Sequence, residues 1–156
     1  RNHLRSRGQD QLFTLLQGEV YGNRILSAEP AEGMLKTLKE LHERGVKMVL
    51  ISHKTRTPYK GPAYDLHQAA LQWLEKYNFF SSTGLNWTEK QIFFEETFES
   101  KINRIKSLKC SHFIDDLPEV INKLPDYTKG IHYCPGNRLQ SHHIHLENWE
   151  TLKELI

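Results

Sequence analysis

The sequence predicts an α/β fold built on a Rossmann-like, doubly wound parallel sheet. Three observations favour this class. Helical and strand-like patterns alternate along most of the chain. The apolar runs ending at Ile51 and Ile114 stop at small polar or acidic residues, as buried parallel strands do. A chain of 156 residues with 38% hydrophobic residues is long enough to bury a sizeable core.

The predicted helices and strands follow from the spacing of the apolar residues. Apolar residues at helical intervals predict helices, and short continuous apolar runs predict strands. Gly45 is expected to close the second helix, because glycine commonly ends helices. In chain order we predict helices over 9–21, 28–45, 64–77, 100–108, 118–124 and 149–156, and strands over 46–51, 91–94, 112–114 and 130–134.

Composition excludes some classes of function. The formal net charge of +2 is too small to indicate nucleic-acid binding. No apolar run is long enough to span a membrane, so no membrane partner is expected. The two cysteines, Cys110 and Cys134, provide no disulfide framework, which favours a reducing cytoplasm. The oligomeric state does not follow from the sequence.

Reactive side chains lie at or just beyond the predicted strand ends. Ser52 ends the first strand, Lys101 opens the helix after the second, and Asp115 and Asp116 end the third. Ligands of parallel α/β sheets bind beyond the carboxyl ends of the strands, so we expect these groups to converge. The hydroxyl and the ammonium would hold phosphoryl oxygens, and the carboxylates would hold Mg²⁺ as hard oxygen ligands. An ordinary strand followed by an acidic helix start is the simpler alternative.

In its order of motifs, the chain resembles the haloacid dehalogenase-like superfamily from about Glu29 to Cys134. The second motif matches the run ending at Ser52, the third matches Lys101, and the fourth matches Asp115-Asp116. The resemblance implies a Mg²⁺-dependent phosphatase acting on a small phosphorylated substrate. Ser52 and Lys101 would then be catalytic groups that bind the phosphoryl group, and Asp115 or Asp116 would ligate the metal.

The superfamily's first motif, D-x-D-x-T or D-x-D-x-V, is missing before Ser52. It supplies the aspartate nucleophile on a central strand. Either the motif lies upstream of residue 1, or the protein has lost it and binds a phosphorylated ligand or a protein partner without turnover. Packing favours the first, because neighbouring strands would otherwise lose a row of hydrogen bonds. Residues 1–28 would form a helical insert or small cap, and 29–156 the core domain.

Other polar residues have both a functional and a structural interpretation. His53, Lys54 and Arg56 follow Ser52 and are expected to bind the anionic substrate, although a solvated basic loop has the same composition. The cluster His142, His143 and His145 invites a zinc site, but no cysteine lies at a typical zinc spacing, so we do not expect one. Both cysteines are expected to be buried small hydrophobes.

Overall fold

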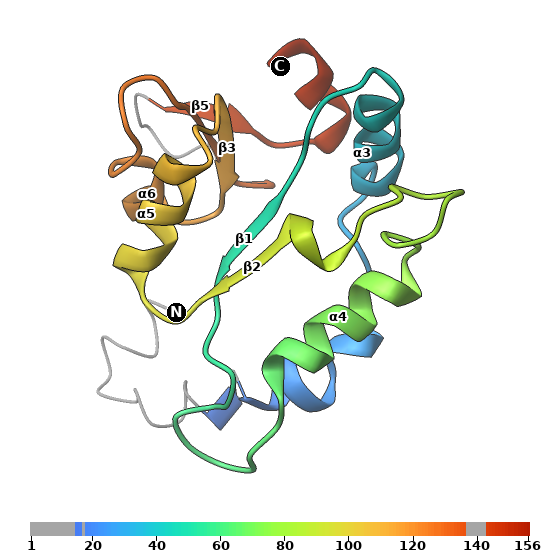
Figure 1. Cartoon of the computed structure of the whole chain (residues 1–156), viewed down its shortest axis with the longest axis vertical. Helices are drawn as coiled ribbons and strands as arrows, with labels where there is room; N and C mark the ends of the chain where they lie inside the picture. The colour runs from blue at the N-terminus through green and yellow to red at the C-terminus, as the bar shows by residue number, and fades with distance from the viewer. Residues whose placement is uncertain (1–14, 17, 137–142) are drawn as a thin grey trace. The chain divides into compact units, whose positions relative to one another are not determined.

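The structure, a computed structural model, describes residues 15–16, 18–136 and 143–156. The chain is mixed α/β, with two short parallel sheets of two and three strands (Figure 1). It divides into two compact units: Arg1–Glu29 with Ser52–Thr97, and Pro30–Ile51 with Phe98–Ile156. Each unit is described separately. The predicted division into residues 1–28 and 29–156 stays a prediction.

The first unit is organised around one long helix. Asp65 caps the start of this helix by accepting a hydrogen bond from the Gln68 N–H. At the other end, the Trp73 indole and the Tyr77 hydroxyl both donate to the Ala28 carbonyl, tying the helix to the N-terminal turns. Its elements are η1 (Glu19–Asn23), η2 (Ile25–Ser27), α4 (Leu66–Lys76), η3 (Glu89–Gln91) and β2 (Ile92–Glu95). The strand β1 (Leu50–His53) pairs with β2 and runs across the boundary of the two units.

The second unit holds a three-stranded parallel sheet in the order β3-β4-β5. Its pairing register aligns Ile114 with Ile131 and Ile131 with Ile144. Its elements are α3 (Met34–Glu43), α5 (Phe98–Ser107), β3 (His112–Asp115), α6 (Pro118–Ile121), β4 (Lys129–Tyr133), β5 (Ile144–Leu146) and η4 (Trp149–Glu154).

One face of this sheet belongs to the hydrophobic core. Leu41 of α3, Ile131, Leu146 and Leu152 of η4 are each at most 1% exposed and form one cluster. Ile114 and Ile144 pack against it. Because side chains alternate along a strand, the residue that follows each of Ile114, Ile131 and Ile144 lies on the opposite face of the sheet. That opposite face carries Asp115, His132 and His145, which the register sets side by side.

Helix α6 approaches the opposite face closely. Gly130 pairs with Phe113, and a Cβ built at Gly130 would lie only 2.6 Å from Ile121 Cγ2. A glycine is therefore required where α6 packs on β4.

Most predicted elements are confirmed with shifted ends. The strand predicted over 46–51 is observed as Leu50–His53, and Val46 and Met48 before it pack against the core cluster without joining a sheet. The helix expected over 9–21 lies mostly outside the described residues, and η1 over Glu19–Asn23 is a π-helix. The terminal helix is a 3₁₀ helix over Trp149–Glu154. Strand β5 was not predicted.

A doubly wound sheet of the haloacid dehalogenase type stays a prediction. None of the helices in the described ranges has the length and apolarity to cross a membrane.

Gly130→Ala tests the packing of α6. We expect it to lower the free energy of unfolding by about 1–3 kcal/mol, because the added methyl group clashes with Ile121. Chemical denaturation of both proteins measures the difference. A stability equal to or above that of the wild type would contradict the close approach, since alanine otherwise improves on glycine within a strand.

Candidate functional site

A buried ion pair lies at the carboxyl end of β3. The Lys101 ammonium donates a hydrogen bond to Asp115 Oδ2, and the two side chains are 8% and 7% exposed. The Leu117 backbone N–H donates to the other carboxylate oxygen over 3.0 Å. The lysine nitrogen also lies 5.5 Å from the centroid of the Phe113 ring. Both charges are therefore compensated, as burial requires.

Helix α5 positions the lysine. Lys101, Ile102 and Ile105 are its buried residues, and their spacing places them on one side of the helix. The two isoleucines anchor that side, so the lysine must enter the interior with them. An ammonium group at this position needs an acidic partner, and Asp115 provides it. The predicted meeting of Lys101 with the acidic pair is confirmed for Asp115.

The two aspartates have different surroundings. Asp115 is buried against Lys101, whereas Asp116 is exposed. The Asp116 carbonyl oxygen accepts a hydrogen bond from His132 Nε2 over 3.2 Å. Its carboxylate makes no hydrogen bond or ion pair with the residues that the structure describes. Asp116 is therefore the freer of the two carboxylates for a ligand.

Ser52 lies in β1, partly buried, and belongs to the first unit, whereas Lys101, Asp115 and Asp116 belong to the second. Its convergence with them stays a prediction.

The basic segment after Ser52 is held by local contacts. His53 Nε2 is hydrogen-bonded to the Glu96 carbonyl oxygen over 3.1 Å. The Lys54 ammonium lies 4.4 Å from the centroid of the Tyr21 ring. Arg56 forms an ion pair with Asp65 at 3.2 Å. The segment, which begins with the last residue of β1, is thus held by contacts with its neighbours, and its predicted role in substrate binding stays a prediction.

Two groups in these contacts have shifted pKa values. Burial lowers the pKa of the Lys54 ammonium, because the charged form loses hydration. The hydrogen bond from the Gln68 backbone and the attraction of Arg56 hold the pKa of Asp65 below its usual value. The fold therefore favours the ionised form of the carboxylate that holds Arg56.

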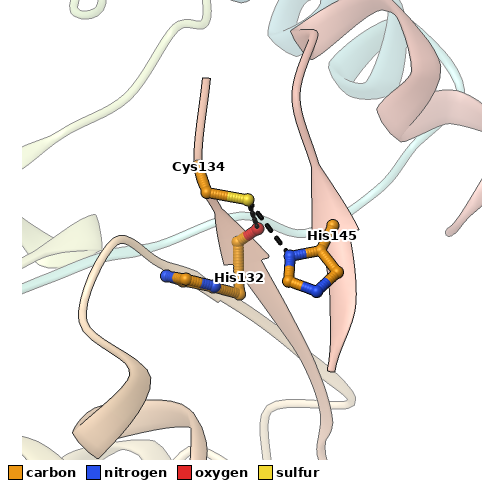
Figure 2. A group of neighbouring side chains, drawn as sticks. All are labelled: His132, Cys134 and His145. Carbon is orange, nitrogen blue, oxygen red and sulfur yellow. Dashed lines mark hydrogen bonds between the residues drawn. The ribbon is translucent and has the colours of Figure 1, made fainter. Parts of the chain in front are cut away.

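A second polar cluster was not predicted from the sequence. His132, Cys134 and His145 each place a potential ligand atom within 4.8 Å of the other two (Figure 2). Sequence spacing gave a partial signal, because His132 and Cys134 are two residues apart on a predicted strand. The position of His145 beside them depends on the pairing of β4 with β5, which the sequence did not predict. Burial raises the pKa of the Cys134 thiol, and the negative charge of Glu147 raises it further. His142 lies outside the described residues.

Comparison with protein-family models, with curated proteins and with solved structures finds no match for this chain. The resemblance to the haloacid dehalogenase-like superfamily therefore stays a prediction.

Replacing Lys101 with methionine tests the ion pair. We expect Lys101→Met to lower the free energy of unfolding by about 3–5 kcal/mol, because Asp115 would remain buried without its counter-charge. The double variant Lys101→Met/Asp115→Leu should recover much of that loss. Denaturant titration measures the free energy of unfolding of all three proteins.

Lys106→Met, at an exposed position of the same helix, is the matched control and should change stability by no more than about 0.5 kcal/mol. Equal effects at positions 101 and 106 would contradict the buried pair.

Asp65→Ala tests the helix cap. Loss of the cap should cost about 1 kcal/mol at neutral pH. Because the folded pKa of Asp65 is lowered, its stabilisation is present above the unfolded pKa and is lost as the pH falls through the folded pKa. The difference between wild type and variant should therefore shrink on acidification, as measured by unfolding at several pH values. A difference that stays constant down to strongly acidic pH would count against the cap.

Proposed function

We propose that this chain provides the lysine and acidic motifs of a Mg²⁺-dependent phosphate monoester hydrolase of the haloacid dehalogenase-like type. The proposal rests above all on one observation. A buried lysine is paired with the first of two adjacent aspartates at the carboxyl end of a parallel strand. Parallel α/β sheets bind their ligands at that end.

The buried pair favours a functional role over a purely structural one. Removing two charges from water is costly, and apolar residues of similar size often stabilise a fold as well or better. A buried charged pair that does not improve stability is therefore more readily explained by a function. At the end of β3, an ammonium and two carboxylates provide what a phosphate and a divalent cation need.

The surroundings of the two aspartates suggest separate roles. Asp115 is engaged by Lys101 and the Leu117 N–H, so we assign it to orienting the lysine. Asp116 is exposed and presents hard oxygen donors, which fits Mg²⁺, an ion that keeps several waters and takes one or two carboxylates. Bound there, Mg²⁺ would neutralise charge on the phosphoryl oxygens. Lys101 would hold those oxygens.

In enzymes of this type the aspartate nucleophile is carried on a strand of the sheet. Among the described residues, β1 pairs only with β2, and β3 pairs only with β4, so each has one unpaired edge. We assign such a strand to the unpaired edge of β3, beside Asp115 and Asp116.

A second candidate is a domain that binds a phosphorylated ligand or a protein partner without turnover. It is favoured by the sequence itself, since no D-x-D motif occurs anywhere in the 156 residues. The same lysine and carboxylates would then bind phosphate and Mg²⁺ without a nucleophile.

Hydrolysis of a generic aryl phosphate by the full-length protein, with and without Mg²⁺, tests the proposal. We expect activity that is lost on chelation and reduced by about 100-fold or more in Asp116→Asn, because the metal loses its protein ligand. Asp126→Asn, also at an exposed aspartate, is the matched control and should keep full activity.

Activity that survives chelation, or an Asp116→Asn variant as active as the control, would overturn the metal role. Absence of hydrolysis combined with Mg²⁺-dependent binding of inorganic phosphate would favour the second candidate. Absence of both would reject the two together.

A further inference from the structure

The strands β4 and β5 bring three soft or borderline ligands to one face of their sheet. His132 and His145 are partners in the parallel register, so their side chains lie on the same side. Cys134, two residues after His132, lies on that side as well, and its backbone N–H continues the pairing by donating to the Leu146 carbonyl. Figure 2 shows the Cys134 sulfur directed toward the His145 ring, with Sγ and Nδ1 3.1 Å apart.

His132 has a buried ring nitrogen for which the described part of the chain offers no hydrogen-bond partner. The residue is 2% exposed, and its Nδ1 makes no hydrogen bond with any residue that the structure describes. Buried polar atoms are nearly always satisfied, so an unpaired one requires a reason. The other nitrogen, Nε2, lies 3.2 Å from the Asp116 carbonyl oxygen, which can only accept a hydrogen bond. Nε2 therefore carries the proton, and Nδ1 presents a lone pair.

This is the arrangement of a metal-binding histidine. Such residues usually donate their second ring N–H to a carbonyl or carboxylate, which fixes the tautomer and the ring orientation. The lone pair of His132 Nδ1 is then available to a cation that lies beside Cys134 and His145.

From these contacts we propose that His132, Cys134 and His145 form a Zn²⁺ site. One thiolate and two imidazoles are typical zinc ligands, whereas Mg²⁺ prefers oxygen. Ligand atoms of a tetrahedral zinc centre lie about 3.3–3.7 Å apart, given Zn–S near 2.3 Å and Zn–N near 2.0–2.1 Å. The three ligand atoms here lie within 4.8 Å of one another, so small side-chain rotations suffice.

The fourth position is open to water or to a further side chain. The His143 ring centroid lies 6.3 Å from that of His132, and His143 is the side chain that we expect to compete with water for this position.

A nucleophilic Cys–His pair is the main alternative for these residues. Reactive cysteines are partly exposed and have lowered pKa values, because the thiolate is the nucleophile. Cys134 is 8% exposed, and burial raises the pKa of its thiol. That environment disfavours a thiolate that has no cation beside it. A nucleophilic Cys–His pair would also leave the unpaired ring nitrogen of His132 unexplained. The zinc site is separate from the proposed Mg²⁺ site and does not depend on it.

Metal binding by the full chain tests this inference. Metal-free, reduced protein is titrated with Zn²⁺ by calorimetry, and with Co²⁺ to follow the thiolate-to-cobalt charge-transfer absorption. We expect one bound ion per chain and a charge-transfer band for the wild type. A Zn²⁺ concentration about a hundredfold above the dissociation constant should raise Tm by roughly 5–10 °C.

Matched variants assign the ligands. Cys134→Ser should abolish the charge-transfer band and weaken Zn²⁺ binding by more than about 100-fold, since even outer-shell partners contribute 10–100-fold. His145→Ala, at a partly exposed position, should weaken binding similarly and provides a second test if Cys134→Ser does not fold. Cys110→Ser, at the other free cysteine, should bind like the wild type. No charge-transfer band in the wild type, or a band lost with Cys110 rather than Cys134, would overturn the proposal.

Discussion

The parallel register of β3, β4 and β5 is the constraint on which both candidate sites depend. It aligns Asp115 with His132 and His132 with His145, so three polar residues form a row on one face of the sheet. The isoleucines that precede them in each strand fill the core on the other face. A shift of one residue would turn every side chain of a strand to the other face, burying charge in the core. The packing of the isoleucines on the apolar face therefore determines which side chains lie on the polar face.

The two proposed sites use different ligands but share one turn. Asp115 and Asp116 provide oxygen donors at the end of β3, whereas His132, Cys134 and His145 provide nitrogen and sulfur. The hydrogen bond between His132 and the Asp116 carbonyl joins the two sets. A cation on His132 would strengthen that hydrogen bond by polarising the ring N–H. Occupancy of the zinc site would then hold the Asp115–Asp116 turn in place.

Much of the fold could be predicted because its signals are local. Helix α4 and strand β3 follow from apolar spacing, and the meeting of Lys101 with Asp115 follows from where their elements end. Strand β5 could not be predicted, since Ile144–Leu146 is short and contains a histidine. The cluster of Cys134 with His145 could not be predicted either, because it joins residues of two strands through a register that only tertiary packing sets. The convergence of Ser52 with Lys101 stays a prediction, because it depends on long-range contacts between segments and not on local apolar spacing.

Nuclear magnetic resonance contacts across β3, β4 and β5 test the register most directly. The account predicts backbone proton contacts that pair Asp115 with His132 and His132 with His145, and side-chain contacts of Ile114 and Ile144 with the core cluster that contains Ile131 and Leu152. Contacts displaced by one residue on β4 or β5 would place His132 and His145 on opposite faces. That result would contradict the shared polar face and the metal site built on it.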